Sequence, residues 1–460
     1  MKKERESVRN RIPLVLLCTF VIMIFATSQV FAAGKQEGGK EEAVTITLWI
    51  QSYGNDVGMS KVLDDINNRF EKRTGNKVEY SILQWGESEA KHMLAAQGGE
   101  APDIMDEYWL FSRVAAGKGK FGPLPLNDIL AEKFGSLEAW EKNYYEVALN
   151  YADVKLTDGN YYGVPWRIEC MPMLIRTDLF KEAGIVDANG NAKAPTTYKE
   201  LLEYAQKLTI DKNGDGVIDQ YGIALSWGPD LFVQGVMQVM YQGGSQILNP
   251  EATKSTLYQP TVIEALQYWR DAVCKYKVID PGVLSPSYNG MVEIQSGRGA
   301  MNMTVNASQF AELKAKIPDL QIKSALHPMG PATAETTGGA AAFVLYRQTK
   351  HLSETLEYLW FLTEPDNMGP IVESVGVLPA DRRVAARPFF ANDPMYKIHV
   401  KQLESAGPMD YPIPEWAEIL GWSEGAPLHD LIVGVLDCSG GSVEALVKTA
   451  HNKINDLLTK

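Results

Sequence analysis

The sequence predicts an α/β protein built from two lobes. The chain has 460 residues, which exceeds what one hydrophobic core usually supports, because larger chains divide into separate domains. Helix and strand patterns alternate along nearly the whole chain, which is typical of α/β folds with largely parallel sheets. A hydrophobic content of 45% with 22% charged residues is ordinary for a globular protein. These proportions exclude disorder over the whole chain.

The first residues have the pattern of a secretory signal. Basic residues come first, then an apolar run over 12–26, then small residues that suit cleavage after Ala32 or Ala33. The alternative is an uncleaved membrane anchor, but the apolar run is shorter than the about 20 residues that cross a bilayer. We therefore predict a cleaved signal peptide over residues 1–32 and a secreted protein, periplasmic or extracellular.

A flexible tether is predicted between the signal peptide and the folded protein. Residues 33–43 are mostly polar and rich in glycine, with almost nothing to bury. A lipid-anchored form of the chain is disfavoured, because Leu17 precedes Cys18 at a place where a lipidation signal has Gly or Ala.

The charge of the chain excludes two classes of partner. The formal net charge is −13, and residues 1–32 contribute five basic and two acidic side chains, a net +3, so the rest of the chain carries −16. A strongly acidic protein repels phosphate groups. Nucleic acids and anionic membranes are therefore poor partners.

The folded part begins with a strand, a helix and a strand. Residues 44–50 and 77–83 have strand patterns, and residues 63–70 place apolar side chains at helical spacing. Elements in this order form a right-handed parallel unit. A second helix over 90–96 and a third strand over 103–105 follow.

Later helices are marked by start signals and amphipathic spacing. The helix predicted over 194–208 opens with Pro195, and Thr197 and Glu200 have the spacing of a capping box. Further amphipathic helices are predicted over 261–276, 353–363 and 443–458.

Short motifs follow one another over nearly all of the mature chain in the order of a known family. They are VTITLWI, FEKRTGNKVEYS, GGEAPDIM, YYGVPW, LIRTDLFKEAGI with APTTYKELLEYAQKLT, DKNGDGVIDQYGIAL, SGRGAMNMTVNASQF, TTGGAAAFVL, EYLWFLTEPDN and GVLPA. In this order the chain resembles the extracellular solute-binding proteins of family 1, the group that contains maltose-binding protein. The series is specific to the family, but it says little about which ligand is bound.

The resemblance implies a fold, a function and a partner. The implied fold is the periplasmic binding protein type II fold, with two lobes, a hinge that the chain crosses three times and a ligand cleft between the lobes. The implied function is the capture of a small-molecule carbohydrate, a sugar or oligosaccharide, by a monomer that delivers it to the transmembrane subunits of an ABC-type permease. The resemblance implies binding without turnover, and no cofactor is required.

The family pattern also implies where the lobes meet. It places the three crossings near residues 166–169, 337–341 and 376–380. The lobes that follow from it are 44–167 with 338–377 for lobe 1, and 168–337 with 378–460 for lobe 2.

A sugar site needs aromatic rings beside planar polar groups, because sugars offer both C–H faces and hydroxyl edges. Loops at the ends of several predicted strands supply this mixture, and ligands of open α/β sheets bind at the carboxyl ends of strands. The candidate ligand-binding residues are Trp49, Trp85, Glu107, Tyr108, Trp166, Arg167, Glu169, Trp227, Asp230, Asn306, Gln309, Gly338, Gly339 and Trp416.

Each candidate has an alternative interpretation. A Trp or Tyr can equally be a core or interface residue, since Trp is largely buried in most folds. Arg167 and Glu169 can instead form an ion pair on the crossing strand. Gly338 and Gly339 are candidates because glycine permits the backbone angles that a hinge or a close ligand approach requires.

One loop has the spacing of an EF-hand calcium site. Its oxygen ligands are Asp211, Asn213, Asp215, the carbonyl of Val217, and Asp219. The motif is incomplete, because Gly222 stands where a bidentate Glu is expected. A structural calcium ion is therefore one prediction, and a turn rich in Asp and Asn is the other.

Three cysteines remain after cleavage, Cys170, Cys274 and Cys438. An odd number in an oxidising compartment allows at most one disulfide. Their scattered positions favour small buried apolar side chains over a disulfide framework.

Two other functions use the same kinds of residue. An extracellular glycoside hydrolase would need two carboxylates at a defined separation. The sequence has no zinc HExxH, GxSxG, phosphate-loop or dinucleotide motif, and the six His residues have no metal spacing. A sensor that presents its ligand to a receptor would share the fold and differ in its partner. The resemblance favours a binding protein that is not an enzyme.

Overall fold

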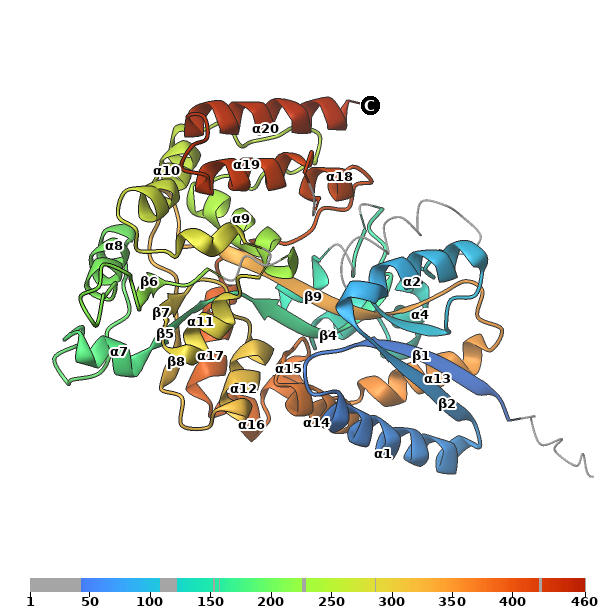
Figure 1. The fold of residues 1–460 in the computed structure, drawn as a ribbon. Helices are drawn as coiled ribbons and strands as arrows, with labels where there is room; N and C mark the ends of the chain where they lie inside the picture. The colour runs from blue at the N-terminus through green and yellow to red at the C-terminus, as the bar shows by residue number, and fades with distance from the viewer. Residues whose placement is uncertain are drawn as a thin grey trace, which may run out of the picture. The chain divides into compact units, whose positions relative to one another are not determined.

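A computed structural model describes residues 43–459, apart from 108–121, 152–153, 157, 226–228, 286 and 422–423. It is an α/β protein with two β-sheets, as Figure 1 shows, and the predicted fold class is confirmed. The predicted signal peptide and residues 33–42 of the predicted tether lie outside the described residues. Within those residues, no helix is both long and apolar enough to cross a membrane.

The first sheet has seven strands in the order β10-β4-β9-β3-β1-β2, and β11 pairs with β9. The strands are β1 (Thr45–Gln51), β2 (Lys77–Leu83), β3 (Ile104–Glu107), β4 (Gly163–Cys170), β9 (Thr336–Leu345), β10 (Leu378–Pro379) and β11 (Ala406–Pro408). β1 pairs in parallel with β2 and β3. The parallel pairing predicted for the N-terminal strands is thus confirmed.

The second sheet has four strands in the order β6-β7-β5-β8. They are β5 (Met173–Arg176), β6 (Tyr221–Ile223), β7 (Gly299–Asn302) and β8 (Ile322–Ala325). β6 and β7 are parallel, whereas β5 runs antiparallel to β7 and β8.

The prediction of largely parallel sheets is wrong. In the first sheet β9 is antiparallel to both β3 and β4. The chain leaves this sheet along β4, builds all four strands of the second sheet, and returns along β9. The returning strand therefore runs in the opposite direction to the one that leaves.

Helices pack on both sheets. Those that contribute to the core around the first sheet are α1 (Asp56–Thr74), α2 (Trp85–Gly98), α4 (Asn127–Phe134), α5 (Leu137–Glu141), α6 (Glu146–Leu149), α13 (Leu352–Thr363), α14 (Pro365–Val375), α15 (Arg382–Ala385), α16 (Pro388–Ala391) and α17 (Pro394–Leu403). Those around the second sheet are α7 (Thr177–Glu182), α8 (Tyr198–Lys207), α9 (Pro229–Gln242), α10 (Pro260–Cys274), the 3₁₀ turn η1 (Pro281–Leu284), α11 (Gly290–Ser296), α12 (Ala307–Lys316), α18 (Trp416–Leu420), α19 (Pro427–Leu436) and α20 (Val443–Leu458).

Local sequence signals account for the start, the buried face and the end of helix α1. The Asn55 side chain accepts a hydrogen bond from the backbone N–H of Gly58 and so caps the first turn. Leu63, Ile66 and Phe70 lie on one buried face, at the spacing that predicts a helix. Gly75 ends the helix with φ of 83°, which an L side chain adopts only with strain.

Helix α8 begins later than predicted, at Tyr198. The Thr197 hydroxyl accepts a hydrogen bond from the N–H of Glu200, so Thr197 is the N-cap and the residues before it are outside the helix. The Glu200 carboxylate completes no capping box, because it accepts from the N–H and hydroxyl of Thr196 instead.

Two large hydrophobic cores lie around the two sheets, and the chain passes between them three times. The first two passages are residues 171–172 and 326–335, and the third follows β11, between Met409 of the first core and Tyr411 of the second. The second lobe was predicted to resume at residue 378. The buried side chains from residue 378 onward instead join the first core as far as Met409, among them Val384, Phe390 and Leu403.

Hydrogen bonds tie the first two passages to each other and to α17. The carbonyl of Met171 accepts from the Thr336 hydroxyl at 2.8 Å and lies 2.5 Å from Nε2 of His327. The N–H of His327 donates to the Gln402 side chain on α17 at 2.9 Å. Burial lowers the pKa of His327 to about 4, so this imidazole is neutral at pH 7.

Candidate ligand-binding site

The site is built around the carboxylate of Asp106, which is fully buried near the carboxyl end of β3. Its Oδ1 accepts a hydrogen bond from the indole N–H of Trp166 at 2.7 Å. Its Oδ2 accepts from the Tyr53 hydroxyl at 2.9 Å and from the N–H of Gln51 at 3.1 Å. Burial raises the pKa of Asp106, and the charge of Arg167 opposes that shift. This carboxylate therefore joins the ends of β1 and β3 to β4.

Aromatic rings pack around this carboxylate. Tyr53 makes edge contacts with Trp166 and Trp85, with ring centroids 5.3 and 5.6 Å apart. Trp166 also stacks on Phe343 of β9 at 5.6 Å. Trp166 is 1% exposed, whereas Trp85 is 38% exposed. Trp85 is thus the member of this group that offers ring surface to a ligand.

The next residues of β4 connect the first sheet to α12. The Arg167 guanidinium lies 4.5 Å from the centre of the Tyr53 ring and 3.0 Å from the Glu169 carboxylate. The same Glu169 oxygen accepts from the side-chain amide of Asn306 at 3.3 Å. Because Asn306 caps α12, which follows β7 of the second sheet, this contact joins the two parts of the fold.

A second buried carboxylate stands beside the first. Glu107 is fully buried and accepts from the Tyr346 hydroxyl at 2.5 Å. Its other oxygen lies 3.8 Å from Nδ1 of His92 and has no hydrogen-bond partner among the described residues. The His92 ring stacks on Trp49 at 5.9 Å. His92 of α2 thus lies between Trp49 of β1 and Glu107 of β3.

Aromatic and carboxylate groups from the ends of β1 and β3 and from β4 thus lie together across β9, which stands between β3 and β4 in the sheet. The family profile described as bacterial extracellular solute-binding protein matches residues 66–398 of this chain.

This chain belongs to that family.

Proteins named as binding proteins in Brucella abortus and Brucella suis are 23% identical to this solute-binding protein over 430 residues, which is 91% of this chain and 94% of theirs.

Solved structures share the fold. A solute-binding protein of an ABC transporter from Thermotoga lettingae, bound with α-D-tagatose, has a TM-score of 0.74 and 23% identity over 90% of this chain and 100% of its own. The GacH receptor of Streptomyces glaucescens, solved unliganded and with acarbose, has a TM-score of 0.72 and 20% identity over 91% of this chain and 100% of its own. These likenesses confirm the type II periplasmic binding protein fold.

Several residues that were predicted to bind the ligand lie outside the cluster around Asp106. Trp416 is fully buried in the second core, where its ring lies 4.6 Å from that of Tyr411, which is the core interpretation. Gln309 is used within α12, because its side chain accepts from the N–H of Asn306 and completes a capping box. Neither side chain is brought to the cluster around Asp106.

Gly338 and Gly339 lie inside β9, paired with Cys170 and Glu169 of β4. A Cβ at Gly338 would come within 2.7 Å of the Ala406 side chain on β11. The strands approach too closely there for a larger residue, so packing accounts for this glycine without a ligand.

Three further candidate side chains are not among those that the structure describes. Tyr108 and Trp227 lie outside the described residues, as does the side chain of Asp230. Their roles stay predictions.

Two residues of the cluster, Tyr53 and Asp106, are absent from the predicted set. Asp106 directly follows the strand predicted over 103–105, and Tyr53 comes three residues after the strand predicted over 44–50, which is a usable signal. Neighbouring residues at a strand end alternate between faces, and the sequence does not say which face is the inner one.

The DKNGDGVID loop is held by its own side chains. Both oxygens of Asp211 accept backbone N–H groups, from Gly214 at 2.7 Å and Gly216 at 2.8 Å. No group of three or more His, Cys, Asp or Glu side chains suited to a metal occurs among the described residues. The contacts are those of a turn rich in Asp and Asn, and the calcium site stays a prediction.

The cysteines differ from the favoured interpretation. Cys274 at the end of α10 and Cys438 beyond α19 form a disulfide. The favoured interpretation was small buried apolar side chains, with at most one disulfide allowed. The packing of these two helices brings distant residues together in a way that spacing alone does not reveal. Cys170 is free and buried, as expected.

Proposed function

We propose that this solute-binding protein captures a sugar or oligosaccharide between its two lobes and delivers it to an ABC-type permease. The observation that carries the proposal is the cluster around Asp106, which brings aromatic rings and carboxylates from three strand ends beside the β4 crossing strand. Related folds of known structure were solved with tagatose and acarbose, which supports the same ligand class here.

The chemistry of the cluster suits a sugar. The exposed ring of Trp85 offers a surface for the C–H faces of a sugar. The Asp106 carboxylate holds the rings and is already satisfied by three donors, so it positions Trp166 and Tyr53 and is not itself a ligand contact.

Closure of the lobes follows from contacts on both sides of the hinge. A ligand shifts the balance between open and closed forms only by binding one of them more tightly. The Glu169–Asn306 contact joins β4 to α12 and is suited to stabilise one arrangement of the lobes. The permease would then recognise the closed form. We further propose secretion through a cleaved signal, and binding without bond cleavage.

A ligand screen tests the proposal. Calorimetry and thermal shift with mono- and oligosaccharides should show one class that binds and raises the melting temperature, because a ligand that binds only the folded state stabilises it. Trp85→Ala should weaken that binding about tenfold through loss of the ring face, while the protein stays folded. Tyr258→Ala is the control, since Tyr258 is a similarly exposed ring on the surface beside α20.

Two results would contradict the proposal. A response to a polyamine or peptide with none across the sugars would exclude a sugar ligand while leaving the fold intact. Release of a cleaved oligosaccharide would instead indicate a hydrolase.

A further inference from the structure

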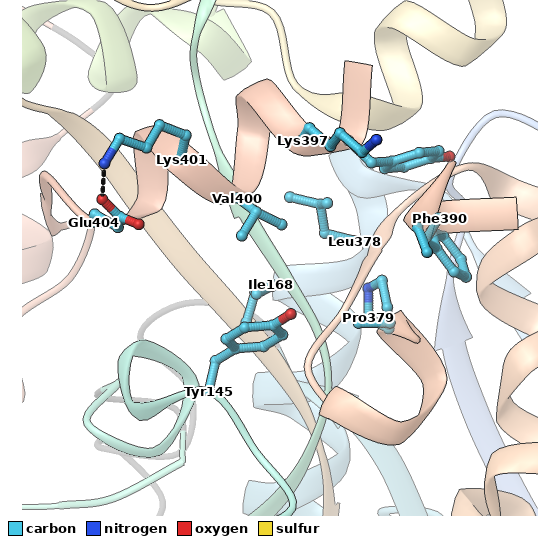
Figure 2. Close-up of a pocket in the computed structure, with 12 residues that line it drawn as sticks. Tyr145, Ile168, Leu378, Pro379, Phe390, Lys397, Val400, Lys401 and Glu404 are labelled. Atoms are coloured by element: carbon cyan, nitrogen blue, oxygen red, sulfur yellow. Dashed lines mark hydrogen bonds and ion pairs between the residues drawn. The ribbon is translucent and has the colours of Figure 1, made fainter. Parts of the chain in front are cut away.

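A cavity of 370 Å³ lies on the other side of the β4 crossing strand from the candidate site. Arg167 and Glu169 point toward Tyr53 and Asn306, whereas Ile168 between them lines the cavity. Neighbouring side chains of a strand point to opposite faces, so the two sites share one strand. Figure 2 shows Ile168 facing the cavity beside Tyr145 and Val400.

The inner wall of the cavity is apolar and made by the crossing segments. Leu378 and Pro379 of β10, which pair with Ile168 and Arg167, form one side. Phe390 of α16 and Val400 of α17 form the others. The volume is at the low end of the range for small-molecule sites, about 300–1,000 Å³.

The mouth of the cavity is cationic. Lys397 and Lys401 both line it and stand four residues apart on α17, so they share one face of the helix. Glu404 pairs with Lys401, as the dashed line in Figure 2 marks. Lys397 has no ion-pair partner among the described residues. One positive charge of this mouth is therefore left over in a strongly acidic protein.

We infer that this cavity binds a small apolar molecule carrying one carboxylate, with the apolar body against Ile168, Leu378 and Phe390 and the carboxylate at Lys397. An apolar wall with a single charged group at its edge is the arrangement that fixes such a ligand in one orientation. Lys397 supplies a charge-assisted hydrogen bond, which is stronger than a neutral one.

The inferred site is coupled to the candidate sugar site. A molecule against Ile168 and Pro379 contacts the strand pair that carries Arg167 and Glu169. If its fit differs between the open and closed forms, it changes the affinity for sugar, and sugar changes its affinity by the same factor. This coupling rests on the proposed function, whereas binding of the carboxylate does not.

The probe is 4-phenylbutyrate, and 4-phenylbutan-1-ol is its uncharged match. Calorimetry on the full chain should show that the acid binds at least tenfold more tightly than the alcohol. Lys397→Met should weaken acid binding at least fivefold, and Val400→Trp, which fills the cavity, should abolish it. Lys199→Met, which removes an 86% exposed lysine on α8, should leave it unchanged. Circular dichroism verifies that each variant is folded.

Hydrogen exchange measures the effect of the bound acid on the hinge strands in the absence of a sugar. The acid should slow the exchange of the backbone amides of β4 and of Leu378 in β10, and leave those of α20 unchanged. Absence of acid binding, equal binding of acid and alcohol, or full binding by a folded Val400→Trp variant would each overturn the inference. Acid binding by a protein that responds to no sugar would leave the cavity site standing and refute the proposed function.

With a sugar that binds, the coupling is measured directly. Saturating 4-phenylbutyrate should change the sugar affinity at least threefold, and the sugar should change the acid affinity equally. An unchanged sugar affinity at saturating acid would refute the coupling.

Discussion

Removal of the Cys274–Cys438 disulfide should cost this protein much of its stability. The bond closes a loop with a sequence separation of 164 residues. In the chain-entropy treatment, a loop of that length restricts the unfolded chain by about 5 kcal/mol, while measured losses from removing native disulfides are about 2–5 kcal/mol. We therefore expect Cys274→Ser/Cys438→Ser to lose at least about 2 kcal/mol of the free energy of unfolding.

The assay is urea unfolding followed by circular dichroism. The wild-type protein in reducing buffer should match the double variant, and the double variant should not respond to the reductant. Cys170→Ala separates the effect of the bond from that of the free thiol, because Cys170 is the cysteine outside the disulfide. A difference below about 1 kcal/mol between the wild-type protein and the double variant would show that the loop is already restricted in the unfolded chain.

Two further outcomes can be measured on the same protein. Burial lowers the pKa of His327 to about 4 and that of His399 to about 3, so the unfolded chain binds more protons below the ordinary value of about 6.5. The free energy of unfolding should therefore be highest above pH 6.5 and fall by about 2 kcal/mol per histidine between pH 6.5 and 5. In urea unfolding, His399→Gln should remove about half of this fall. An equal fall in the variant would refute the lowered pKa of His399. Gly338→Ala should destabilise by about 1–3 kcal/mol, because the new Cβ would meet Ala406 at 2.7 Å. Gly98→Ala, at a helical position with nothing within 4 Å, should be neutral or stabilising, and similar losses in both variants would argue against the close strand approach.

Local signals in the sequence predicted the helices well. The predicted helix at 443–458 has the same bounds as α20, and the one at 353–363 differs from α13 by one residue. Caps and apolar spacing act within a few residues of each other, so they can be identified without the fold.

Strand pairing could not be predicted in the same way. β9 pairs with β3 and β4, which lie far earlier in the chain, and with β11, which lies after it. No local pattern carries the direction in which such distant strands meet. The sequence allowed one disulfide, but its two cysteines, Cys274 and Cys438, could not be identified for the same reason.

The candidate site was predictable in its residue types more than in its geometry. Trp85, Trp166, Arg167 and Glu169 were predicted and lie close to one another, and the Arg167–Glu169 ion pair was the stated alternative for those two. Whether the aromatic rings point into a core or toward a ligand depends on what packs behind them. Trp416 is of the same residue type as Trp85 and Trp166, but it lies in the second core because hydrophobic side chains pack around it.

With a sugar as the proposed ligand, Trp85 has a consequence for the selectivity of the protein. Its indole N–H already donates to the carbonyl of Ser52 at 2.6 Å, so the exposed part of the side chain is the ring. A ring face attracts the C–H surface of a sugar whatever the configuration of each hydroxyl. Such a contact tolerates epimers and accommodates sugars joined by different linkages. Discrimination between stereoisomers therefore has to arise from polar groups around it, and those positions can change through evolution while the aromatic platform stays as it is.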